Sequence, residues 1–192
     1  MGVFDLGIFP VWTQSQQVEP VLSYILDQSK TEDPLVLAGF DIQPTGSSMP
    51  MARRFEELKA FLKSRIEDFK ESDYPIFFEL IADPAKSMRQ KPSRDKTRLF
   101  ETDVKRLQED ILAPGVSSEA EIMARSIKNL KQTFSLFWNA DLRVPGNTPH
   151  VFNLRDKGMA ENMTLLKEKI WPGKKMIVWG ANTHLGYGRG FL

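Results

Sequence analysis

Two short, continuously apolar runs near opposite ends of this chain constrain its fold more than any other feature. The first, residues 35–40, reads LVLAGF after a proline, and the second, residues 176–179, reads MIVW after a Pro-Gly turn. Runs this short and this apolar are typical of strands that are covered on both faces, as in parallel sheets. The long stretch between them follows a helical period. The sequence therefore predicts an α/β fold that is dominated by helices.

Apolar residues recur at the spacing of one helix face along most of the chain. The pattern predicts helices over residues 18–29, 50–72, 74–88, 95–112, 117–138 and 153–170. A Pro-Gly turn at 114–115 separates two of these helices, which we expect to pair antiparallel. The basic run over residues 86–98 is interpreted as a solvated loop, with a phosphate or nucleic-acid contact as the alternative.

The predicted sheet is incomplete. Strands covered on both faces need further strands beside them, yet the rest of the sequence supplies helices. Either residues 3–11 form a third strand, or the remaining strands are encoded in residues that this chain lacks, which we favour. The expected fold is one domain over residues 1–192, with a small, mostly parallel sheet and a helical insertion over about 50–138. Because an incomplete sheet exposes an apolar edge, we also expect self-association.

Composition argues against several classes of function. The 26 Lys and Arg residues nearly cancel the 25 Asp and Glu residues, so no net field favours nucleic acid or an anionic membrane. The chain has no cysteine, which rules out thiolate chemistry and fits a reducing cytoplasm. Asp5 and Pro10 interrupt the apolar N-terminus, which lacks the basic start of a secretory signal. No window approaches the roughly 20 apolar residues of a membrane span. We expect a cytoplasmic protein with neither nucleic acid nor membrane as a partner.

Polar residues follow both predicted strands, at the edge where parallel sheets bind ligands. Asp41 comes directly after the first strand, and Asn182 and His184 follow the second. His184 is one of two histidines, and an imidazole near neutral pH suits acid–base catalysis; a packing or surface role is the alternative. Asp41 is suited to orient that histidine, although an aspartate after a strand also caps turns. The sequence thus predicts a site at this rim.

Arg155 is a second candidate. In the first turn of the last predicted helix, a cation opposes the helix macrodipole by about 0.3–1 kcal/mol, so a partner should hold it there. Asn162 lies seven residues on, on the same helix face, and we interpret both side chains as substrate-binding. The alternative is an ion pair between Arg155 and a strand-end carboxylate such as Asp41. Glu161 is interpreted as a residue on the solvent side of this helix.

Three segments of the chain resemble the erythromycin esterase family in order and spacing. They are residues 37–43 (LAGFDIQ), 153–162 (NLRDKGMAEN) and 175–184 (KMIVWGANTH). The resemblance implies an α/β fold with a helical insertion, in a family of macrolide-hydrolysing esterases and relatives linked to succinoglycan biosynthesis. It also implies that an activated water opens an ester or macrolactone through histidine and carboxylate side chains, with no metal, other cofactor or covalent nucleophile.

The chain departs from the family pattern at two places. The late motif of the family has two histidines, and here Ala181 occupies the first position and His184 the second. The early cluster of Glu and His, which supplies the general base, lies upstream of anything that matches this chain. The resemblance implies a truncated ester hydrolase with a small-molecule substrate, in which the catalytic residues are His184 and Asp41 and the substrate-binding residues are Arg155, Asn182 and Asn162. The alternative is a noncatalytic binding or scaffold protein whose helical insertion forms the partner surface.

Overall fold

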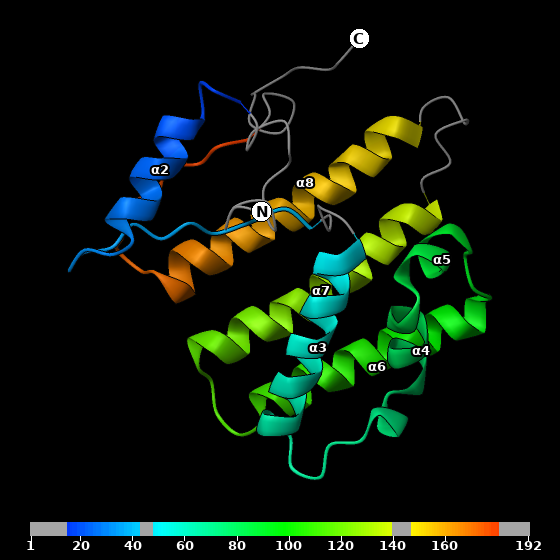
Figure 1. Cartoon of the computed structure of the whole chain (residues 1–192). Helices are drawn as coiled ribbons and strands as arrows, with labels where there is room; N and C mark the ends of the chain where they lie inside the picture. The colour runs from blue at the N-terminus through cyan, green and yellow to red at the C-terminus, as the bar shows by residue number, and fades with distance from the viewer. Residues whose placement is uncertain (1–14, 43–47, 140–146, 181–192) are drawn as a thin grey trace.

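The computed structural model describes residues 15–42, 48–139 and 147–180 (Figure 1). Within these residues the chain is dominated by helices, as predicted. The elements are α2 (Glu19–Gln28), α3 (Ser48–Arg65), a 3-10 turn η2 (Glu71–Asp73), α4 (Pro75–Ala82), α5 (Pro84–Arg89), α6 (Arg94–Leu112), α7 (Ser118–Asn139), α8 (Asn147–Leu165) and a π-helical turn η3 (Leu166–Ile170).

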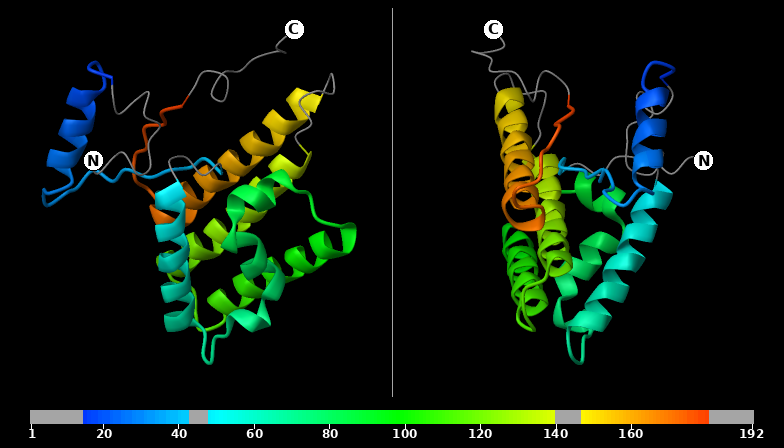
Figure 2. Two further views of the ribbon diagram at one scale, coloured as in Figure 1. Left: turned by 45° about the vertical axis from the view of Figure 1, so that its right-hand side comes forward. Right: turned by 90° about the vertical axis from the view of Figure 1, so that its left-hand side faces the viewer.

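Helices α6, α7 and α8 lie side by side and alternate in direction (Figure 1; Figure 2). The expected antiparallel pairing of α6 with α7 is seen, and the turn between them contains Gly115 at a φ of 122°, a conformation that favours glycine. Helix α4 packs against α6, and α5 packs against α7. Helix α3 joins the same body through the Nε of Arg65, which donates to the Ile111 carbonyl of α6 at 2.9 Å.

The hydrophobic core lies where α3, α4, α6 and α7 meet. Phe100 of α6 is fully buried, and its ring centroid lies 5.5 Å from that of Phe134 and 5.7 Å from that of Trp138, both in edge-on geometry. Such aromatic pairs contribute beyond the apolar area they bury. Phe134 is fully buried too, and other fully buried side chains among the described residues include Leu62, Phe77, Val104, Leu107, Ile111 and Ile127. This core fixes α7, and α7 in turn presents its other side to α8.

Three of the helices differ from those expected. The helix expected over residues 50–72 ends at Arg65, and residues 71–73 form the separate 3-10 turn η2. The predicted helix 74–88 is divided into α4 and α5 at Pro84, which has no backbone N–H to continue the helix. Helix α8 begins at Asn147, ahead of the predicted start at residue 153. Arg155 therefore lies well inside the helix, and the macrodipole argument that singled it out does not apply.

The parallel sheet is not confirmed. Within the described residues, neither 35–41 nor 174–180 pairs as a strand. Their apolar side chains remain substantially exposed, namely Leu35, Val36, Leu37, Ile177, Val178 and Trp179. An apolar run becomes a buried strand only when a neighbour completes its hydrogen-bond ladder and other elements cover its faces, and the described part of the chain supplies neither. Residues 3–11, the alternative third strand, lie outside the described residues.

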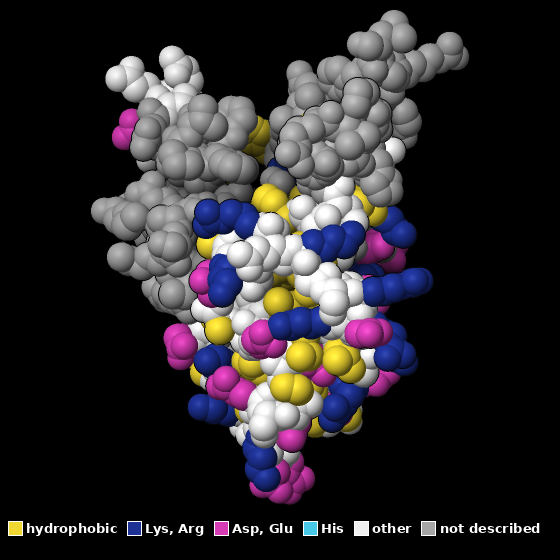
Figure 3. All heavy atoms as spheres, turned by 90° about the vertical axis from the view of Figure 1, so that its right-hand side faces the viewer, with side chains coloured by type: hydrophobic (Ala, Val, Ile, Leu, Met, Phe, Trp, Pro, Cys, Tyr) yellow, Lys and Arg dark blue, Asp and Glu magenta, His cyan; other side chains and the backbone are white. Residues whose placement is uncertain are grey.

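Charges of both signs are interspersed over the face of the molecule in Figure 3, with apolar side chains between them. Charged side chains also pair across helices: Lys96, in the basic run over residues 86–98, pairs with Glu79, and Lys131 pairs with Glu101 at 3.2 Å. The run is only partly a loop, because α5 extends to Arg89 and α6 begins at Arg94. None of the helices in the described ranges is long and apolar enough to cross a membrane.

We expect the chain to self-associate through the exposed apolar side chains of residues 35–37 and 177–179. Ile177 is 99% exposed, so Ile177→Lys removes apolar surface without disturbing packing. This variant should associate less than wild type while its free energy of unfolding changes by less than about 0.5 kcal/mol. Sedimentation velocity over a range of concentrations measures the association.

The matched control for this substitution is Val116→Lys. Val116 is also apolar and 71% exposed, but it lies in the turn between α6 and α7. The Val116→Lys variant should therefore associate as much as wild type. A wild-type chain that stays a monodisperse monomer at every concentration would contradict the expectation.

Candidate functional site

Side chains from α8 hold the chain on either side of the Phe40–Asp41 peptide bond. The carbonyl of Phe40 accepts a hydrogen bond from Nδ2 of Asn162 at 2.8 Å. The carboxylate of Asp41 accepts from Nε of Arg155 at 3.0 Å and from its Nη2. Arg155 and Asn162 therefore do share one face of α8, as their spacing predicted, and that face meets residues 40 and 41.

The next residue, Ile42, is buried and is held from both α7 and α8. Its carbonyl accepts from the hydroxyl of Thr133 on α7. Its side chain lies against Gly158 of α8, where an added Cβ would sit 2.5 Å from Cγ2 of Ile42. Helix α8 comes this close to the segment because residue 158 has no side chain.

The Arg155–Asp41 pair joins residues that are 114 positions apart in the sequence. Both side chains are largely buried, with 17% of Arg155 and 25% of Asp41 exposed. A guanidinium that contacts both carboxylate oxygens fixes the direction of the carboxylate as well as its position. This is the ion pair that the sequence offered as the alternative to substrate binding by Arg155.

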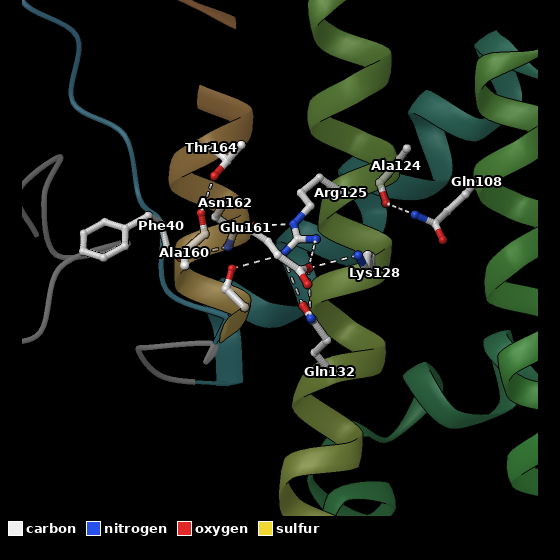
Figure 4. Close-up of polar contacts among 11 residues, drawn as sticks. Phe40, Gln108, Ala124, Arg125, Lys128, Gln132, Ala160, Glu161, Asn162 and Thr164 are labelled. Atoms are coloured by element: carbon white, nitrogen blue, oxygen red, sulfur yellow. Dashed lines mark hydrogen bonds and ion pairs between the residues drawn. The ribbon is translucent and has the colours of Figure 1, made fainter. Parts of the chain in front are cut away.

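A second polar cluster connects α7 to α8 and includes Asn162, the residue that holds the Phe40 carbonyl (Figure 4). Arg125 of α7 donates from Nη1 to Glu161 at 2.7 Å, from Nη2 to the Gly158 carbonyl at 3.0 Å, and from Nε to Oδ1 of Asn162. Lys128, one turn further along α7, lies 2.9 Å from the same Glu161 oxygen. We call these five residues the Arg125 cluster.

Glu161 carries the negative charge of the Arg125 cluster. Its partial burial alone would raise the pKa of the carboxyl, but hydrogen bonds from Arg125 and Lys128, with their positive charges, outweigh this and lower the pKa to about 2. The interpretation that Glu161 faces solvent is therefore wrong. The reason is that α7 packs on this side of α8 and brings two cations to it.

Three of the five predicted site residues, Asp41, Arg155 and Asn162, are brought together by these contacts. Asn182 and His184 lie outside the described residues, so their position at this rim stays a prediction. A groove of about 590 Å³ lies along α6 and α7, and none of the five residues lines it. In the described ranges no group of three His, Asp or Glu side chains is placed to hold a metal ion.

Sequence reasoning missed the α7 half of this site. Arg125, Lys128 and Gln132 recur at helical spacing, which places them on one polar stripe of α7. Gln132 also donates to Glu161, at 3.4 Å. This stripe can be seen in the sequence. Whether it faces solvent or another helix depends on how the helices pack, and the spacing within one helix does not show how they pack.

The fold and the site define a helix-rich protein in which two helices fix an aspartate at the end of an apolar run. The chain belongs to the erythromycin esterase family, whose pattern, described as erythromycin esterase, matches residues 3–190. This confirms the resemblance seen in the sequence.

One relative from Bacillus subtilis (strain 168), named "Putative hydrolase YbfO", is 28% identical over 193 residues. The match covers 93% of this chain but 42% of that protein, so the chain spans less than half the length of this relative. No solved structure matches the chain significantly.

The close approach at Gly158 can be tested by Gly158→Ala. Alanine improves helix propensity by up to about 1 kcal/mol, but its Cβ would lie 2.5 Å from Ile42 Cγ2. We expect the free energy of unfolding, measured in urea, to fall by about 1–3 kcal/mol, because a packed neighbour must shift. The loss should shrink in an Ile42→Ala background.

Gly39→Ala is the matched control, because an added Cβ there meets nothing within 4 Å. It should leave stability almost unchanged. A Gly158→Ala variant as stable as wild type would show that α8 does not approach the segment this closely.

The lowered pKa of Glu161 predicts a specific dependence of stability on pH. The ionised form is favoured in the folded state, so its contribution is complete above the ordinary pKa of 4.5 and is lost as pH falls toward about 2. Glu161→Gln should therefore lower the free energy of unfolding by about 1–3 kcal/mol at neutral pH. This difference from wild type should shrink as the pH falls from 4.5 toward about 2. Urea unfolding along an acid titration measures it.

Glu109→Gln serves as the control for this titration. Glu109 is 62% exposed and forms an ion pair of 3.6 Å with Lys105, so its substitution should cost less than about 0.5 kcal/mol. A Glu161→Gln deficit that stays constant from neutral to acid pH would contradict the role given to the Glu161 charge.

Proposed function

We propose that this chain is part of an ester hydrolase that opens a macrolide-like ester with an activated water. The observation that carries the proposal is the Arg155–Asp41 pair. It joins two of the segments on which the family resemblance rests, residues 37–43 and 153–162. Membership of the erythromycin esterase family and similarity to a protein named as a hydrolase support the same reaction class. A cytoplasmic location is part of the proposal.

Each predicted site residue has a role in this proposal. Asp41, held in direction by Arg155, orients the imidazole of His184. The pair uses two of the five N–H donors of Arg155, and one of the remaining donors is assigned to the ester carbonyl oxygen, where negative charge develops during attack. Asn182 supplies a further donor to the substrate. Substrate binding by Asn162 stays a prediction, and both polar atoms of its amide have partners within the protein.

In this proposal the reaction divides between residues of this chain and residues in the part of the relative that the chain does not cover. A general base takes a proton from water, the water oxygen attacks the carbonyl carbon, and the bond to the alkoxy oxygen breaks. His184 delivers a proton to the departing oxygen, so the products are a carboxylic acid and an alcohol. We place the general base in the part of the relative that this chain does not cover, since Ala181 leaves one motif histidine here.

The test is hydrolysis of a chromogenic ester and of a macrolactone by three proteins. These are the isolated chain, the chain joined to the part of the Bacillus subtilis relative that it does not cover, and the joined chain carrying His184→Ala. The isolated chain should be nearly inactive. The joined chain should turn over, and His184→Ala should lower kcat by roughly 10²- to 10⁴-fold.

His150→Ala, which removes the other histidine, is the matched control and should leave kcat unchanged. Appreciable hydrolysis by the isolated chain, or a joined chain indifferent to His184, would overturn the proposed roles. A joined chain that folds but hydrolyses neither substrate would favour the scaffold alternative.

A further inference from the structure

We propose that Arg125 is a positioning residue for this site, acting through Asn162 on Asp41. The inference rests on the proposed function, because it assigns Arg125 to the site that contains Asp41. Arg125 lies on α7, outside residues 37–43, 153–162 and 175–184, although within the range 3–190 that matches the family. Its side chain is 11% exposed, so it is held within the protein rather than at the surface.

Arg125 first fixes the orientation of the Asn162 amide. A side-chain amide has two orientations that exchange its oxygen with its nitrogen, and its partners decide between them. Nε of Arg125 donates to Oδ1, so the oxygen faces α7 and Nδ2 faces the Phe40 carbonyl at 2.8 Å (Figure 4). The opposite orientation would set carbonyl against carbonyl and an NH₂ group against a guanidinium. Arg125 therefore selects the orientation in which Asn162 holds Phe40.

Arg125 is itself held in place by three partners on α8. Its guanidinium donates to the Glu161 carboxylate at 2.7 Å and to the Gly158 carbonyl at 3.0 Å, in addition to Asn162. Three partners on about one turn of α8 match the fork of donors that a guanidinium presents. A lysine at this position keeps the charge near Glu161 but is a point charge and cannot serve all three partners.

The contact at Phe40 fixes the backbone of Asp41. The Phe40 carbonyl belongs to the peptide that carries the Asp41 nitrogen, so the hydrogen bond from Asn162 fixes the backbone from which the Asp41 side chain departs. In the described ranges this backbone is in no sheet ladder. Asn162 is 5% exposed, so water does not readily replace its hydrogen bonds. Loss of this contact should release the Asp41 carboxylate from its bidentate geometry with Arg155.

The test compares Arg125→Lys and Asn162→Asp with the matched control Lys128→Gln. Lys128 donates to the same Glu161 oxygen at 2.9 Å, so the control weakens the α7–α8 contact while leaving Asn162 untouched. In the 192-residue chain, the readout is the NMR signal of the Arg155 Nε–H group, which the ion pair protects from solvent exchange. Unfolding in urea measures the stability of each variant alongside it.

Arg125→Lys and Asn162→Asp should both lose the protected Arg155 signal, and Lys128→Gln should keep it. In the joined chain, Arg125→Lys should lower kcat by up to about 10²-fold with little change in KM, because it misplaces Asp41. If the joined chain shows no hydrolysis, the proposed function fails, while the NMR comparison still decides the positioning role. A protected Arg155 signal in Arg125→Lys, or its equal loss in Lys128→Gln, would overturn the inference.

Discussion

The ion pair between Asp41 and Arg155 is the contact on which the arrangement of the site depends. It ties a segment that precedes α3 to helix α8, 114 residues later. Hydrogen bonds to the Phe40 and Ile42 carbonyls come from α8 and α7, so three successive residues have polar contacts to helices. These contacts give the segment a defined path, and within the described residues no sheet ladder adds to them.

The molecule divides its stability between two kinds of contact. The body formed by α3, α4, α6 and α7 has an apolar and aromatic core centred on Phe100. The contact between α7 and α8 is instead polar and charged in the Arg125 cluster. The Arg125 side chain is 11% exposed and the Glu161 side chain 30%, so removing either one leaves the other partly desolvated and without its partner, and both positions are sensitive to substitution. The apolar core fixes where α7 lies, and the polar contact then fixes how α8 and Asp41 lie against it.

Most of the helical body could be predicted from the sequence, because α3, α4, α6 and α7 each bury apolar side chains that recur at helical spacing. The path of residues 35–40 could not be predicted in the same way. This run is apolar enough for a buried strand, but the described residues supply neither a neighbouring strand nor a cover for it. The pairing of Arg155 with Asp41 was foreseen as one of two alternatives. Glu161 and Arg125 were not recognised, since a charge on a helix face gives no sign of whether solvent or another helix meets it.

A double-mutant cycle between Asp41 and Arg155 tests most directly whether a side-chain pair holds this segment. Urea unfolding of wild type, Asp41→Asn, Arg155→Gln and the double variant gives the coupling free energy between the two side chains. A largely buried, bidentate pair predicts a coupling of about 1.5–3 kcal/mol. A coupling near zero would contradict the claim, because it would mean that the segment keeps its place without the pair.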